Sequence, residues 1–68
     1  MSTTDLDARA SALRGVARAI RAIDTTGLTR DERNELDALY VRYIGAAVGA
    51  EAVYVAAVGA QRAANEAA

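Results

Sequence analysis

The chain has 68 residues and a net charge of -1, and it contains no Cys, no His and no Lys. A chain this short buries only about 60% of the surface that its unfolded state exposes, so its stability is marginal without reinforcement. The lack of Cys and His excludes disulfides and structural zinc. Oligomerisation is the remaining common source of stability.

Composition also narrows the classes of function. Without His, Cys and Lys the chain lacks the usual general base, thiol nucleophile and Schiff-base amine, and nothing near its only serines would activate them. The acids Asp31, Glu32 and Glu35 fit the first turn of a helix better than a metal site, since the oxygen-rich loop of an EF-hand is missing. We therefore expect a non-enzymatic protein with no catalytic residue, no cofactor and no metal.

A first helix is predicted over about residues 5–25. Thr4 and Asp7 have the spacing of a capping box, in which a hydroxyl and a carboxylate meet free backbone N–H groups. Apolar residues then recur every three or four positions up to Ile23, which is typical of one buried helix face. The pattern stops at DTTG, where we expect Gly27 to adopt the left-handed conformation that ends many helices.

A second helix is predicted over about residues 30–65. Thr29 and Glu32 form the clearest capping box in the chain, and no Pro interrupts the residues that follow. The two helices would be roughly 30 and 54 Å long at 1.5 Å per residue. Because a short connection favours antiparallel neighbours, the predicted fold is all-α: an αα-hairpin with unequal arms, forming one domain over residues 1–68.

The unequal arms predict both an internal contact and an unpaired segment. Pairing the helices back from the turn places Leu6 near Ala50, where the first helix runs out. The predicted contact between the helices consists of large apolar residues: Leu6, Leu13, Val16, Ile20, Ile23, Leu36, Leu39 and Tyr43. From about Val53 onward the second helix extends past the first, which indicates that it has a partner.

Residues 43–60, YIGAAVGAEAVYVAAVGA, form the most apolar segment and carry a single charge, Glu51. Sorted by helical position, one side of this segment holds small residues bordered by valines. Each Gly inside a helix costs about 1 kcal/mol relative to Ala, so several on one side indicate that another backbone approaches closely. The predicted oligomer interface consists of Gly45, Val48, Gly49, Ala52, Val55, Ala56, Gly59 and Ala63. We expect a homo-oligomeric helical bundle, either a dimer or a tetramer.

The same segment supports a membrane alternative. Its length reaches the lower limit for spanning a bilayer, and Gly45 and Gly49 form the GxxxG motif of close helix dimers in lipid. Ala and Gly drive insertion poorly, however, and Glu51 at the centre would cost roughly 2.5 to 3.5 kcal/mol on insertion scales. A soluble bundle is the favoured interpretation, and a holin-like or surface-anchored membrane protein is the alternative.

Two charged features are candidate sites. Glu51 is a candidate functional carboxylate, which we expect on a solvated strip, beside an arginine such as Arg9, or at a symmetry axis of the bundle. Arg14, Arg18 and Arg21 are expected to lie opposite the apolar face, as a solvated or anion-binding stripe. No helix-turn-helix pattern accompanies this stripe, so a nucleic-acid-associated regulator is the weakest alternative.

The biological setting is only outlined by the sequence. All eight basic residues are Arg, which is typical of a GC-rich genome, such as that of an actinobacterium or its phage. The first residues, MSTTDLD, lack the features of a signal peptide, so we expect a cytoplasmic protein, or a virion-associated one if a phage encodes it. The expected role is structural: a self-associating scaffold, an adaptor for another protein, or an accessory subunit.

Overall fold

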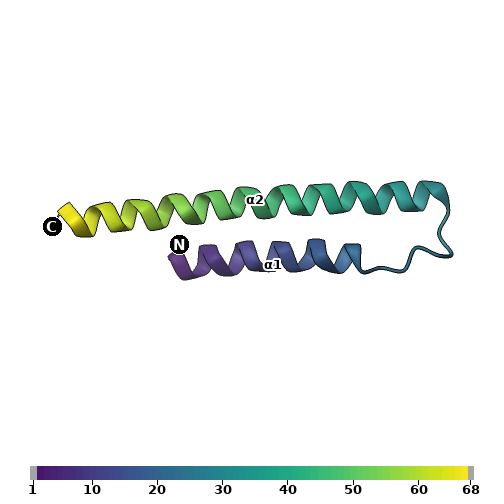
Figure 1. The fold of residues 1–68 in the computed structure, drawn as a ribbon, viewed down its shortest axis with the longest axis horizontal. Helices are drawn as coiled ribbons and strands as arrows, with labels where there is room; N and C mark the ends of the chain where they lie inside the picture. Colours follow the sequence, from purple (N-terminus) through teal and green to yellow (C-terminus); the bar gives the residue numbers. More distant parts are fainter. Residues whose placement is uncertain (1, 68) are drawn as a thin grey trace.

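The computed structural model describes residues 2–67, which form two antiparallel helices joined by a turn (Figure 1). Helix α1 covers Thr3–Arg21, and helix α2 covers Arg30–Ala67. They contain 19 and 38 residues, and the whole rod measures 59 × 14 × 14 Å. The predicted all-α hairpin with a short first and a long second helix is confirmed.

Helix α1 begins two residues earlier than predicted. Ser2 is its N-cap, and the Ser2 hydroxyl accepts a hydrogen bond from the Asp5 N–H at 3.2 Å. Thr4 already lies inside the first turn, so the predicted capping pair of Thr4 and Asp7 is wrong. Ser2 and Asp5 have the same three-residue spacing as that pair, and the earlier pair lets the helix gain two more residues.

Helix α1 also ends earlier than predicted, at Arg21 and not near Thr25. The Asp24 carboxylate accepts hydrogen bonds from the Thr26 N–H at 3.0 Å and the Thr26 hydroxyl at 2.6 Å, which gives this backbone an alternative to the helix. The Leu28 N–H then donates to the Thr25 carbonyl at 3.1 Å and closes a turn. Gly27 lies in this turn without a positive φ, so the predicted left-handed conformation is wrong.

Helix α2 begins where the sequence predicts. The Glu32 N–H donates to the Thr29 hydroxyl at 3.2 Å, and the Thr29 N–H donates to the Glu32 carboxylate at 2.9 Å. These two reciprocal bonds are a complete capping box. Asp31 adds a second carboxylate to the same turn, where the helix dipole favours negative charge. The helix then continues without interruption to Ala67.

Alanines form the only fully covered contact between the helices within the described residues. Ala10 and Ala17 of α1 and Ala47 of α2 are 3%, 1% and 0% exposed. Small side chains at this position let the two backbones lie close together. The larger residues predicted for this contact flank the alanines: Leu6, Leu13, Ile20, Leu36 and Tyr43 are half-buried, whereas Val16, Ile23 and Leu39 are exposed.

Helix α1 covers little more than half of α2. Leu6 and Ala50 line the same groove between the helices, in agreement with the pairing predicted from the sequence. Ala57 and Val58 are still half-buried, but every residue from 59 to 67 is exposed. The uncovered end of α2 therefore begins at residue 59, somewhat beyond the predicted Val53. Figure 1 shows α2 continuing past the start of α1.

The cap of α2 gives a prediction with a matched control. Replacing Thr29 by Ala removes the hydroxyl that satisfies the Glu32 N–H, so it should lower the free energy of unfolding by about 1 kcal/mol. Replacing Thr4 by Ala makes the same chemical change inside α1, where no cap is lost, and should change it by less than about 0.5 kcal/mol. Urea denaturation at one protein concentration measures both, and equal losses would contradict this assignment of caps.

Stability should also fall in acid because of two carboxylates at the turn. The Thr29 N–H, and less strongly its hydroxyl, lower the pKa of Glu32, and the Thr26 hydroxyl and then its N–H lower the pKa of Asp24. A carboxylate whose pKa is lower in the folded chain stabilises the fold above its unfolded pKa, and this contribution disappears as pH falls through the folded pKa.

The melting temperature should therefore drop on acidification below about pH 4. This drop should be smaller in the double variant Asp24→Asn/Glu32→Gln than in the wild type. The control variant Asp7→Asn/Glu35→Gln removes two exposed carboxylates that accept no hydrogen bond within residues 2–67. It should retain the wild-type acid sensitivity. Thermal melts followed by circular dichroism between pH 7 and pH 3 provide the comparison.

Candidate functional site: an interaction surface on α2

The eight residues predicted as an oligomer interface share one surface of α2. We call this surface the outer face of α2; it consists of Gly45, Val48, Gly49, Ala52, Val55, Ala56, Gly59 and Ala63. All eight are exposed. Ala56 follows the buried Ala47 by nine residues, which is two and a half helical turns, so the outer face points away from α1. The hairpin therefore leaves this whole surface uncovered.

The glycines of the outer face are not required by the hairpin itself. A Cβ atom added at Gly45, Gly49 or Gly59 would meet no other atom within 4 Å. None of them has a positive φ that would need glycine. Because glycine costs about 1 kcal/mol relative to alanine inside a helix, the isolated hairpin would be more stable with alanine at these three positions. Their presence is explained if a second backbone packs against them.

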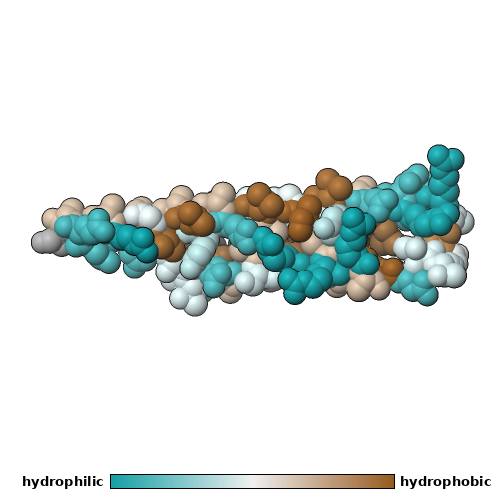
Figure 2. All heavy atoms as spheres, viewed as in Figure 1, coloured by the Kyte–Doolittle hydropathy of each residue, from teal (hydrophilic) through white to brown (hydrophobic). Residues whose placement is uncertain are grey.

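The outer face belongs to a long apolar surface. Helix α2 contains an 18-residue window with a mean hydropathy of 1.5, of which only 6% is buried. By length and composition alone, α2 could cross a membrane. In Figure 2 hydrophobic atoms gather along the edge of the rod that α2 forms, while hydrophilic atoms cover the end of the rod beside the turn. An exposed apolar surface of this extent marks an interaction site.

An apolar groove lies beside the outer face, between the two helices. Leu6 and Leu13 of α1 line it together with Ala46, Gly49 and Val53 of α2. Gly49 therefore borders both the groove and the outer face. A large side chain at Gly49 would fill this groove as well as block the outer face, so Gly45 and Gly59 are the cleaner positions for testing the face.

Glu51 is paired across the hairpin with Arg14. The two side chains form a salt bridge and are 41% and 47% exposed for Arg14 and Glu51, respectively. Arg9, the neighbour considered from the sequence, instead lines the apolar groove. The only charge of residues 43–60 is thus neutralised within the chain. A pair this exposed contributes roughly 0.2–1 kcal/mol to stability.

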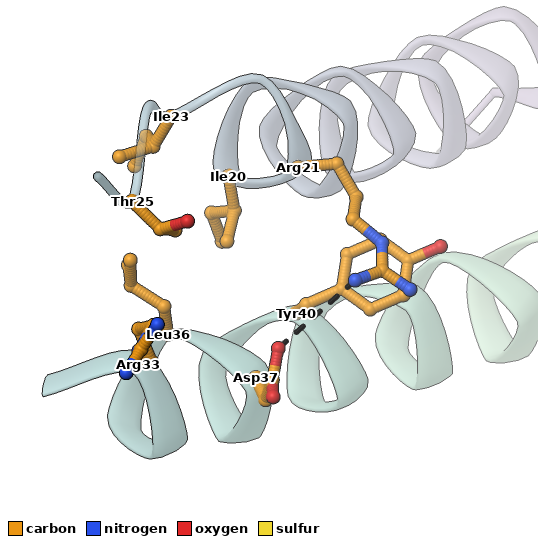
Figure 3. Close-up of a pocket in the computed structure, with 8 residues that line it drawn as sticks. All are labelled: Ile20, Arg21, Ile23, Thr25, Arg33, Leu36, Asp37 and Tyr40. Atoms are coloured by element: carbon orange, nitrogen blue, oxygen red, sulfur yellow. Dashed lines mark ion pairs between the residues drawn. The ribbon is translucent and has the colours of Figure 1, made fainter. Parts of the chain in front are cut away.

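Arg21 also crosses to α2. Its guanidinium carbon lies 4.3 Å from the centroid of the Tyr40 ring, and one of its nitrogens is 4.0 Å from the Asp37 carboxylate. Figure 3 shows the Arg21 side chain reaching over the Tyr40 ring near a pocket that Ile20 and Leu36 also line. The cation–π contact is the stronger of the two, since a 4.0 Å ion pair between exposed side chains is weak.

The arginine stripe predicted on the far side of α1 is therefore wrong in its placement. Arg14 and Arg21 lie three residues before and four residues after the buried Ala17, so both flank the contact with α2. Arg18 is exposed. Two of the three guanidiniums are therefore engaged on α2, and Arg14 is paired closely with a carboxylate.

The remaining candidate sites are clusters of metal ligands and the pocket at the turn. Within residues 2–67, no three residues among Asp, Glu, His and Cys lie close enough together to hold a metal ion. The pocket at the turn is lined by Thr25 and by aliphatic, arginine and tyrosine side chains around Asp37. The extended apolar surface of α2 is the main candidate site.

Comparison with known protein families, with curated proteins and with solved structures finds no match to this chain.

The pair of Arg14 and Glu51 predicts a measurable coupling. In a double-mutant cycle, Arg14→Gln and Glu51→Gln should show an interaction energy of about 0.2–1 kcal/mol in the free energy of unfolding. This coupling should shrink on raising the salt concentration from about 0.05 M to 1 M, because exposed charges are screened. The cycle of Arg9→Gln with Glu51→Gln is the control and should show no coupling. Equal coupling in both cycles would contradict the pairing.

Proposed function

We propose that this protein is a non-enzymatic helical hairpin that assembles with copies of itself through α2. The observation that carries the proposal is the exposure of α2: its most apolar 18-residue window is only 6% buried by the rest of the chain. Exposed apolar surface costs free energy in water, and covering it contributes about 25 cal/mol per Å². A second copy supplies such a cover without any other component.

The proposed biological role is structural. The assembled hairpins would form a scaffold, an adaptor for another protein, or an accessory part of a larger particle, in the cytoplasm or in a virion. Two observations favour assembly in water over insertion into a bilayer. The Arg14–Glu51 pair lies beside the middle of the apolar segment, and Arg9 of α1 also lies there, in the groove that Ala46 and Val53 line. In a bilayer these charges would be costly.

The rival function is that of a small membrane protein that inserts α2, with α1 on the membrane surface. The observation that favours it is the same apolar window, which is long enough to span a bilayer. The two functions differ in what covers α2: protein in one case and lipid in the other.

Introducing a charge into the outer face tests the proposal. The purified 7.1 kDa chain in detergent-free buffer should show at least twice its monomer mass by light scattering at micromolar concentration. Ala52→Arg should convert it to monomer, because a buried unpaired arginine in a tight contact costs several kcal/mol. Ala12→Arg is the matched control: it adds the same charge to an exposed position of α1 and should keep the wild-type mass.

Two outcomes would overturn the proposal. One is a wild-type chain that remains monomeric at high micromolar concentration. The other is a chain that sediments with membranes and leaves them only in detergent, which would support the rival function. Equal loss of mass in Ala52→Arg and Ala12→Arg would instead show that the outer face is not the contact.

A further inference from the structure

The outer face is bordered by valines that repeat with the same spacing as its small residues. Val41, Val48 and Val55 lie seven residues apart and are 64%, 59% and 67% exposed. A second series, also seven apart, begins four residues after Val41: Gly45, Ala52 and Gly59. Residues that alternate by four and three share one seam of a helix. This seam therefore alternates one projecting side chain with one small residue.

Such a seam fits a second copy of itself in one direction. In an antiparallel pair in which residue n lies opposite residue 100 − n, each valine of one copy faces a small residue of the other. These facing pairs are Val41 with Gly59, Val48 with Ala52 and Val55 with Gly45, each pair formed twice. The valine side chains fill the space left by the missing side chains, as close packing requires.

A parallel pair in register fits less well. It places Val48 against Val48 and Gly45 against Gly45, so bulky layers that push the helices apart alternate with glycine layers that leave voids.

The hydrophobic seam also determines the register of the antiparallel pair. Moving one copy by seven residues toward the C-terminus places Arg62 opposite Gly45 and Val41 opposite Glu66. Moving it the other way places Gly59 opposite Asn34.

We propose that two copies associate through antiparallel α2 helices, about a twofold axis near residue 50. This inference rests on the proposed self-assembly. Helix α1 of each copy stays on the outside, because it packs against the opposite side of α2 at Ala47. The two Glu51 side chains come near each other at the axis, and each is neutralised by Arg14 of its own hairpin. The pair therefore joins without an unpaired central charge.

The contact is long enough to be specific. Residues 33–67 of each α2 overlap, which is about 50 Å at 1.5 Å per residue. A seam of this length and about 10–12 Å wide covers roughly 500–600 Å² per copy, close to the roughly 600 Å² per partner at the lower end of specific interfaces. The rod itself is 59 Å long, so the seam uses nearly all of α2.

Spin-label distances determine the direction of the helices. The chain contains no cysteine, so Asn65→Cys or Glu35→Cys introduces a single labelled site at an exposed position of α2 outside the seam. In the antiparallel pair, two labels at residue 65 lie 30 residues apart along the axis, about 45 Å. A mixture of chains labelled at 35 and at 65 should instead give a short distance, below about 25 Å. A parallel pair reverses both results and would overturn the proposal.

A filled cavity provides the second measurement. Gly59→Leu places a large side chain opposite Val41 of the second copy and should raise the dissociation constant at least about tenfold. Gly15→Leu makes the same change on α1, where an added Cβ also meets nothing within 4 Å, and should leave the constant unchanged. Equal effects of the two variants would overturn the seam.

The two proposals fail in different ways. A stable oligomer with parallel distances, or one in which Gly59→Leu has no effect, leaves self-assembly standing and removes the antiparallel seam. A chain that stays monomeric, or that is found only in membranes, removes both.

Discussion

The structure depends on a close contact of alanines between two helices of unequal length. Among residues 2–67, Ala10, Ala17 and Ala47 are the three that are buried. Alanine lets helices approach closely, but each methyl group removes little apolar surface from water, on the order of 0.8 kcal/mol per buried carbon. Three such residues cannot offset the conformational entropy of ordering two helices, which is about 1–2 kcal/mol for each residue fixed. The hairpin leaves the apolar side of α2 exposed, and the proposed self-assembly would cover it.

Helix periodicity and the capping box at Thr29 and Glu32 were sufficient to predict the architecture. The capping box could be recognised because its two residues have no competing pair nearby, and the structure confirms both hydrogen bonds. At the start of α1 the chain offers two equivalent pairs, two residues apart, and local spacing alone does not decide between them. At the end of α1, the side chain of Asp24 stops the helix through its own hydrogen bonds, a competition that periodicity does not register.

The exposure of the outer face could be predicted, but the charged contacts near it could not. Exposure of the outer face follows from helical geometry, because residues nine positions apart lie on opposite sides of a helix. The partner of Glu51 depends on the rotation of α1 about its axis. That rotation is fixed by the buried alanines, whereas the periodicity of the large apolar residues predicts a contact through Val16 and Ile23, which are exposed. With the alanines turned inward, Arg14 and Arg21 move to the border of the contact and meet carboxylates on α2.

The turn between the helices has a consequence for the order of events in folding. Residues 22–29 close a contact between neighbouring segments, so the hairpin forms from interactions that are local in sequence. Helical proteins of this kind fold in microseconds to milliseconds, whereas the meeting of two chains depends on their concentration. Under the proposed assembly, the contacts within each hairpin would therefore form faster than two dilute chains meet. Dilution would slow the burial of α2 while leaving the rate of hairpin formation unchanged.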